Sequence, residues 1–210
     1  NLPEGFVPAE PSRFLETWSD LEVEDRWILS RYSAAVANST RLIEAYQLGE
    51  AGRGLFEFVW SELADWYVEA AKTRLYGDDE EEAEVVRQVL LTVFGGSLAL
   101  LHPYMPFVTE AVWGHLPRRP DAGPALIVAR WPTALHRDPE AEAACALLQE
   151  LVTGIRNARA EYDVEPGRRI PAIIAAGERA ESLEAQAGIL HSLARLAGDE
   201  TVIAASPEAP

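Results

Sequence analysis

The chain has 210 residues, 48% of them hydrophobic, so it is long enough to bury the core of one large domain or of two small ones. Its 34 acidic residues outnumber its 18 basic residues, and the resulting net charge of −16 argues against a nucleic-acid-binding protein with a uniformly basic surface. Cys145 is the only cysteine, which excludes an intrachain disulfide and predicts a reducing, cytoplasmic setting.

Much of the acidic charge is concentrated in one run, because residues 78–84 read DDEEEAE. Such a run is typical of a helix start, where each carboxylate is stabilised by the helix dipole by about 1 kcal/mol or less. Net charge is therefore a weak argument against a local basic strip that binds RNA. No apolar run approaches the roughly 18 residues that cross a bilayer, and no leader segment is apparent, so we expect neither membrane insertion nor secretion.

The first 116 residues predict a connector followed by four helices. Three prolines among the first eleven residues indicate an extended connector over residues 1–20. Apolar residues with a period near 3.6, and a proline suited to a first helical turn, then predict helices at 23–47, 50–76, 80–101 and 106–116. Short turns between successive helices predict an up-down bundle.

The remaining residues change in character. Residues 117–139 read as a loop that contains a short extended piece, ALIVARWP, and we place a subdomain boundary near Arg137. A helix at 139–162, a strand in RIPAIIAA, helical segments at 178–197 and a strand in TVIAA follow in that order. We therefore expect a mainly α fold in which a bundle over residues 21–137 precedes a small α/β subdomain over 138–210.

Two blocks of sequence are more specific than any argument from composition. Residues 58–72 read FVWSELADWYVEAAK, and residues 101–110 read LHPYMPFVTE. They resemble the helical anticodon-binding region of the valine–tRNA ligase family, class I aminoacyl-tRNA synthetases with a Trp-x-Glu-x-Cys-Asp-Trp-Tyr-x-Glu-x-x-Lys helix and a Leu-His-Pro-x-Met-Pro-Phe-x-Thr-Glu turn. Ala64 stands where the family usually has Cys. Three further blocks resemble the family: DRWILSRY at 25–32, KTRLY at 72–76 and IRNARAEYDVEPGRRI at 155–170.

The resemblance implies a parent enzyme that activates valine with ATP and Mg, charges tRNA(Val) and hydrolyses mischarged threonine. In the family these reactions take place on other domains, and the activating fold carries His-x-Gly-His and Lys-Met-Ser-Lys-Ser signatures. Neither signature occurs in this sequence, whose only lysine is Lys72. The chain begins at Asn1 and ends in PEAP, so we expect an excised, non-catalytic piece without a cofactor of its own.

The same resemblance predicts the partners of this piece. They are tRNA(Val) and the catalytic domain of the same chain, within a parent enzyme that we expect to be a monomer and not to contact a membrane. In the family a helix with a Leu-Trp-Asn-x-x-Arg-Phe sequence lies just upstream and contributes to anticodon recognition. Residues 1–20 are then the connector from the missing catalytic domain.

KTRLYG places Lys72, Arg74 and Tyr76 within about one turn at the end of the second predicted helix, where cations also stabilise the helix dipole. In the resembled class I enzymes this end of the bundle faces the anticodon stem-loop, and Lys72 matches the family motif directly. We expect phosphate contacts from Lys72 and Arg74 and base stacking from Tyr76. Two other basic pairs either contact tRNA or form interdomain salt bridges: Arg118 with Arg119, and Arg156 with Arg159.

The aromatic side chains of the first block have two interpretations. Exposed, they could stack on RNA bases, at about 1–3 kcal/mol per base. Helical spacing favours burial instead, where loss of such a ring would cost roughly 3–5 kcal/mol. We therefore predict that Trp60, Trp66 and Tyr67 lie in the core.

Asp65 and Glu69 lie one helical turn apart, a spacing at which two carboxylates could share a metal or act as an acid and base. No histidine or cysteine is placed to complete such a set. We predict ion pairs instead: Glu69 with Lys72, and Asp65 with an arginine of a neighbouring helix such as Arg26 or Arg31.

No residue pattern indicates catalysis or a metal site. The histidines are scattered without His-x-x-x-His spacing, and Ser97 and Cys145 lack an adjacent base. Two alternatives stay open beside the valine enzyme. One is the same region of an isoleucine–tRNA ligase, and the other is a helical protein-docking module without RNA contact, which the negative charge suggests.

Overall fold

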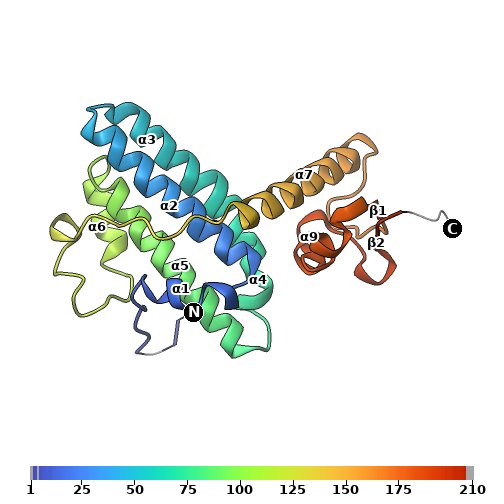
Figure 1. Ribbon diagram of the computed structural model, residues 1–210, viewed down its shortest axis with the longest axis horizontal. Coiled ribbons are helices and arrows are strands. Elements are labelled where there is room, and N and C mark those ends of the chain that lie inside the picture. The colour runs from blue at the N-terminus through green and yellow to red at the C-terminus, as the bar shows by residue number, and fades with distance from the viewer. Residues whose placement is uncertain (1, 4, 207–210) are drawn as a thin grey trace. The chain divides into compact units, whose positions relative to one another are not determined.

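The computed structural model describes residues 2–3 and 5–206 and is mainly helical (Figure 1). The chain divides into two compact units, residues 1–139 and 140–210, and each is described by itself. The division falls two residues after Arg137, near which the sequence predicts a boundary. A mainly α fold with a small α/β part is confirmed.

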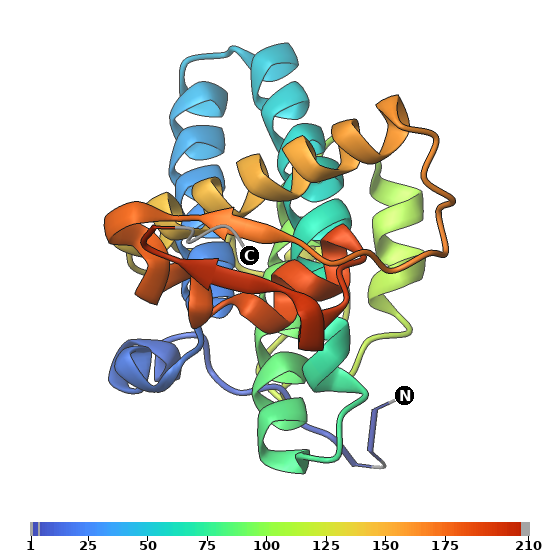
Figure 2. The same ribbon diagram turned by 90° about the vertical axis from the view of Figure 1, so that its right-hand side faces the viewer.

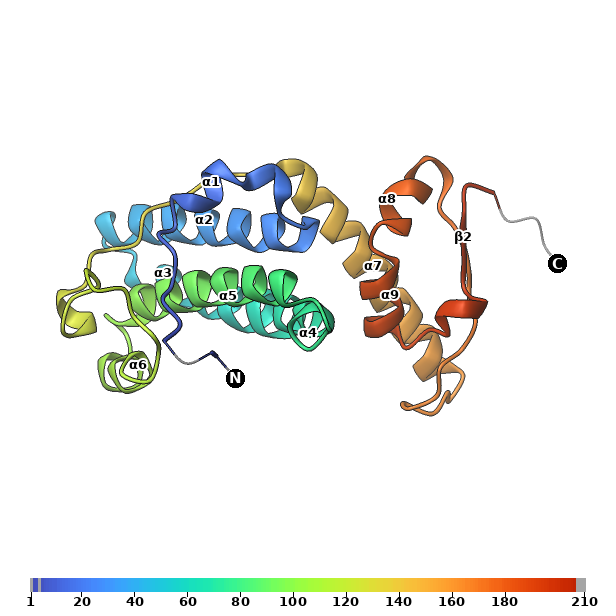
Figure 3. The same ribbon diagram turned by 90° about the horizontal axis from the view of Figure 1, so that it is seen from below.

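The core of the first unit is formed by long helices that run side by side (Figure 3). α2 (Val23–Glu44) packs on α3 (Leu48–Glu57), which continues without a break into the π-helical segment η2 (Phe58–Val68) and α4 (Glu69–Leu75). α5 (Glu80–Leu101) returns against them, and α6 (Pro106–Trp113) follows. The predicted up-down bundle is confirmed, and its core includes Ile28, Leu29, Leu55, Tyr67, Val86, Val89, Val93 and Leu100.

The acidic run starts α5 as predicted. The Asp79 carboxylate accepts hydrogen bonds from the backbone N–H groups of Glu81 and Glu82, at 2.9 and 3.2 Å, and thereby caps the helix. By length and composition α5 is apolar enough to cross a membrane, with a mean hydropathy of 1.5, but many of its side chains are buried in the bundle. The prediction that no apolar stretch is long enough to cross a bilayer is therefore wrong for α5.

The side chains that the second predicted helix turns toward the core differ from the prediction. Its buried residues are spaced by three or four, as in an α-helix, except for a step of five between Phe58 and Leu63. A π-helix closes i→i+5 hydrogen bonds, so η2 accommodates this step and rotates the preceding residues relative to the core. As a result Tyr67 is fully buried, Trp66 is half-buried, and Trp60 is 61% exposed. The prediction of a core position is confirmed for Tyr67 and wrong for Trp60.

The first twenty residues are not simply extended. They contain α1 (Arg13–Glu16) and η1 (Trp18–Asp20), and Phe14 is buried. The segment is held on α5 because Gln88 accepts a hydrogen bond from the Ala9 backbone N–H at 2.6 Å and donates one to the carbonyl of Val7 at 3.3 Å. The expected extended piece in ALIVARWP, residues 125–132, is wrong for its first half, because Leu126–Val128 form the 3₁₀ turn η3 between the extended residues Ala125 and Ala129.

The second unit begins with α7 (Pro139–Glu161), which confirms the predicted helix. The two predicted strands are confirmed but short: β1 (Ile173–Ala175) pairs in parallel with β2 (Val202–Ala204), as Figure 2 shows. Parallel strands require a long crossover, and here it is helical: it consists of η4 (Gly177–Arg179), α8 (Ala180–Glu184), α9 (Ala187–Ala194) and η5 (Gly198–Glu200).

Candidate nucleic-acid interface

The end of α4 is fastened to the start of α2 by a buried polar network. Asp25 is fully buried and accepts two hydrogen bonds from the guanidinium of Arg74, at 2.7 and 2.8 Å, and one from the hydroxyl of Tyr67 at 2.6 Å. Arg74 also pairs with Glu24 at 2.9 Å. The side chain of Arg74 is 12% exposed, so its charge is neutralised within the fold.

Burial dominates the electrostatics of this network. It raises the pKa of the Glu24 carboxyl to about 7, against the opposing effect of Arg74 and with a further rise from Asp25. Burial also raises the pKa of Tyr67 well above its usual value. For Arg74 burial lowers the pKa, but the hydrogen bonds and charge of Asp25 outweigh it, and the net pKa is raised. The guanidinium is therefore permanently charged.

Two of the predicted tRNA-binding residues lie on the surface beside this network. Lys72 is about half exposed and pairs with Glu69, which confirms that predicted pair. Tyr76, the C-cap residue of α4, is 75% exposed. An exposed pair of this kind contributes about 0–1 kcal/mol, so Lys72 can exchange the Glu69 carboxylate for a phosphate at little cost. Arg74, for which a phosphate contact was also predicted, is held by Asp25 and Glu24 instead.

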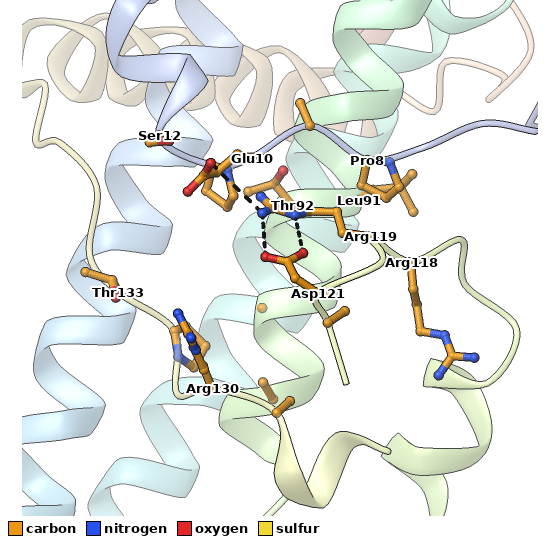
Figure 4. Close-up of a pocket in the computed structure, with 18 of the residues that line it drawn as sticks. Pro8, Glu10, Ser12, Leu91, Thr92, Arg118, Arg119, Asp121, Arg130 and Thr133 are labelled. Atoms are coloured by element: carbon orange, nitrogen blue, oxygen red, sulfur yellow. Dashed lines mark hydrogen bonds and ion pairs between the residues drawn. The ribbon is translucent and has the colours of Figure 1, made fainter. Parts of the chain in front are cut away.

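The arginines of the loop after α6 differ in availability. Arg119 makes two hydrogen bonds to the carboxylate of Asp121, at 2.9 and 2.7 Å, and lies 4.0 Å from Glu10 (Figure 4). This hydrogen bonding raises the pKa of Arg119 and lowers that of Asp121. Arg118 is exposed and donates one long hydrogen bond, of 3.4 Å, to the carbonyl of Pro124. Arg118 is therefore the more available cation.

The two arginines of α7 bind backbone carbonyls in their own unit. Arg156 donates to the carbonyl of Leu193 at 2.9 and 3.1 Å. Arg159 is 7% exposed and donates to three carbonyls, those of Arg168, Glu165 and Arg195, at 2.7, 3.0 and 3.3 Å. Arg156 is also exposed, so the two roles that the sequence left open for it, tRNA contact or an interdomain salt bridge, stay predictions. Arg159 holds α7 against the loops that frame the small sheet.

The predicted partner of Asp65 is wrong. Arg26 pairs with Asp138 at 3.2 Å, and Arg31 makes a bidentate pair with Glu62 at 2.6 and 2.8 Å. Asp65 is exposed on the outer side of η2. Among residues 2–3 and 5–206, no group of three or more His, Cys, Asp or Glu side chains could hold a metal ion.

Two features of this surface were not predicted from the sequence: Asp25 and an exposed aromatic pair. Asp25 heads the DRWILSRY block, and its partners lie in the two blocks that end at Lys72 and Tyr76, but only the fold shows that these segments meet. The rings of Phe56 and Trp60 stack with centroids 6.0 Å apart and planes at 5°, and both are more than 60% exposed. No sequence signal short of recognising the π-helical step could have placed this pair on the surface.

The fold defines a helical-bundle domain in which buried ion pairs hold the end of α4, and this end presents a lysine and a tyrosine. Residues 25–174 match the family model of the anticodon-binding domain of tRNA ligase. The chain belongs to this family.

The most similar relatives include valine–tRNA ligases from several bacteria. The chain is 46% identical over 180 residues to that of Thermosynechococcus vestitus, covering 84% of this chain and 20% of the relative. It is 44% identical over 184 residues to that of Geobacter sulfurreducens, with 86% and 20% covered. For that of Bacillus subtilis the identity is 38% over 175 residues, with 81% and 20% covered. The chain therefore spans about a fifth of the length of these relatives.

Proposed function

We propose that this chain is the part of a valine–tRNA ligase that binds the anticodon arm of tRNA(Val). The parent enzyme activates valine with ATP and Mg, charges tRNA(Val) and removes mischarged threonine on domains outside these residues. The names of the relatives support the valine enzyme over the isoleucine enzyme. In this proposal the domain works by holding the RNA at a fixed position relative to a distant reaction centre, so its binding energy is used for orientation.

The observation that carries the proposal is the end of α4. Lys72 and Tyr76 are exposed there, whereas Arg74 between them is locked to Asp25 and Glu24. The lock fixes the backbone from which both exposed side chains project. Lys72 then contacts a phosphate, and Tyr76 stacks on an unpaired base of the loop.

The test uses a full-length ligase that contains these residues, with tRNA(Val) binding measured between low and moderate salt. Lys72→Ala should weaken binding and reduce the slope of log affinity against log salt by about one, the effect of one lost phosphate contact. Tyr76→Ala should weaken binding by the loss of about 1–3 kcal/mol of stacking, whereas Tyr76→Phe should retain it. Valine-dependent ATP–pyrophosphate exchange should be unchanged in each variant.

Arg53→Ala is the matched control, since Arg53 is an exposed cation in α3, roughly 25 Å from Lys72 along the helix. It should leave the salt slope unaltered. Equal effects of the Lys72 and Arg53 variants would show that only general charge matters. No effect of any of them would favour the second candidate, a protein-docking module, for which the exposed Phe56 and Trp60 pair is the specific observation.

A further inference from the structure

One end of the helical bundle in the first unit is apolar on its outside. α6 turns Thr109 toward the core, whereas Phe107, Val108 and Ala111 are exposed on its outer side. A helix at a protein surface normally carries polar and charged residues on its outer side. The outer side of α6 is therefore an apolar face that no residue among 2–3 and 5–206 covers.

The turn η3 extends this face. The carboxylate of Glu110 in α6 accepts two hydrogen bonds from the Leu126 backbone N–H, at 2.9 and 3.2 Å, and thereby fixes η3 beside α6. Leu126 is buried, but the next two side chains, Ile127 and Val128, are exposed. The same contact engages Glu110, which is the only acidic residue of α6.

The turn between α2 and α3 adds an aromatic ring to the same end. The hydroxyl of Tyr104 donates a hydrogen bond to the carbonyl of Leu48 at 2.9 Å, and its ring lies over Gly52, where an added Cβ would be 3.0 Å away. These contacts join the α2–α3 turn to the residues just before α6. Tyr46 and Met105, which neighbour them in the chain, are both exposed.

We call this surface the apolar end of the bundle. In Figures 1 and 3 the α2–α3 turn, α6 and the segment that contains η3 lie at one end of the first unit, and α4 lies at the other. α5 runs between the two ends for 22 residues, or about 33 Å. The apolar end is therefore remote from Lys72 and Tyr76. It consists of Tyr46, Met105, Phe107, Val108, Ile127 and Val128.

The apolar end is large for a surface that faces only water. An aromatic side chain offers about 150–250 Å², so the almost fully exposed rings of Tyr46 and Phe107 account for roughly 300–400 Å². That area already equals the largest apolar patch of a typical monomer, about 300–600 Å², and four further side chains add to it. Interfaces between domains of one chain cover about 600–1,500 Å². The apolar end thus has the size of an interdomain interface.

We propose that the apolar end is the surface through which this domain docks on the other domains of its parent chain. The proposal rests on the proposed function, because a longer ligase supplies those domains. The matched segment is 20% of each relative, so most of the parent polypeptide lies outside these residues. Its contacting surface is apolar, since a charged group buried there would be left without a partner.

The position of the apolar end agrees with this role. A domain that holds RNA at a fixed distance from a reaction centre must itself be fixed to the domains that carry this centre. The α4 end presents the lysine and the tyrosine proposed to bind RNA. The opposite end of the bundle presents apolar side chains, which suit a permanent contact with protein.

The experiment is hydroxyl-radical footprinting of a full-length ligase that contains these residues, without tRNA, with oxidation rates measured by mass spectrometry. Two matched pairs cancel the chemistry of the side chain. Phe107 is 89% exposed and Phe56 is 63% exposed, so an undocked Phe107 should react faster than Phe56. Docking buries Phe107 and should slow its oxidation about tenfold, which reverses this order. The same reversal is expected for Tyr46, 91% exposed, against Tyr76, 75% exposed.

A charge at the apolar end should open the interface. Phe107→Asp in the full-length ligase should raise the oxidation rates of Met105 and Tyr46 about tenfold, and should lower kcat/KM for aminoacylation about tenfold or more. Ala37→Asp is the control, because it adds the same charge at an exposed position of α2, and it should change neither quantity. Both positions are exposed in this domain, and the footprint of the wild type needs no variant.

Three results would overturn the proposal. Oxidation of Phe107 faster than that of Phe56 would show that the apolar end faces water. Protection that appears only when tRNA(Val) is added would assign the surface to RNA, and protection that is lost on dilution would assign it to a second copy of the chain. Because the footprint is read without tRNA, its outcome is independent of the effect of Lys72→Ala on RNA binding, and either proposal can fail while the other stands.

Discussion

The change of Arg74 to alanine separates a residue that supports the bundle from its neighbour Lys72, which faces solvent. Both are basic, lie two positions apart on α4 and precede the same turn. Arg74 neutralises Asp25 and Glu24, which are 0% and 5% exposed, whereas Lys72 meets one carboxylate at the surface. The two substitutions should therefore have opposite signatures in stability and in RNA binding.

The magnitude follows from burial. Removal of one partner from a buried ion pair leaves a charge without compensation and costs about 3–5 kcal/mol. For a unit of 139 residues this corresponds to a fall in melting temperature of roughly 10–20 °C. Loss of the exposed pair of Lys72 costs about 0–1 kcal/mol, or at most a few degrees.

Thermal and urea unfolding, followed by circular dichroism, measure both variants against wild type. We expect a large loss of stability for Arg74→Ala and none of consequence for Lys72→Ala, with the reverse order for loss of tRNA affinity at a temperature where both are folded. An Arg74→Ala protein that melts within 2 °C of wild type, by the same relation of stability to melting temperature, would refute the reasoning. It would mean that, in the variant, Asp25 and Glu24 are hydrated or protonated at little cost in free energy.

Three further results are expected. Burial raises the Glu24 pKa from 4.5 to about 7, so between these two pH values the folded state binds a proton that the unfolded state lacks. The free energy of unfolding should therefore fall by up to about 3 kcal/mol as the pH rises from 4.5 to about 7. Glu24→Gln should flatten that slope in pH-dependent melts, and an unchanged slope would assign it elsewhere. Gly96→Ala should lower the free energy of unfolding in urea by at least about 1–3 kcal/mol, because its Cβ would overlap Tyr32. Gly95→Ala is the control and should be tolerated, since its Cβ would lie 3.6 Å from Trp113; equal losses for the two variants would contradict this packing. Arg159→Met should lose about 1–3 kcal/mol because three backbone carbonyls lose their hydrogen bonds to a charged, buried guanidinium, and wild-type stability would show that water replaces that donor.

Several features of the fold followed directly from the sequence. The long apolar periods of α2 and α5, the acidic run that starts α5 and the proline that begins α6 are local signals, and the structure has these elements within a few residues of the predicted bounds. The family was also evident, because the resemblance rests on contiguous blocks whose order needs no knowledge of their packing.

The candidate site was predicted less well, since charge and aromatic character do not reveal exposure. Lys72, Arg74 and Tyr76 form one basic block in the sequence, yet their side chains are half exposed, almost buried and exposed. Trp60 was assigned to the core on an α-helical period that the π-helical turns of η2 interrupt.

What the amino-acid sequence determined by itself was therefore the helical class, the approximate ends of the helices and the family. Only the tertiary structure decided which cations are neutralised and which are available, because Arg74 meets Asp25 across 49 residues of chain and Arg159 meets the carbonyl of Arg195 across 36. Local sequence sets the backbone hydrogen bonds of a helix, whereas the partner of a buried charge is set by which segments the packed core brings together.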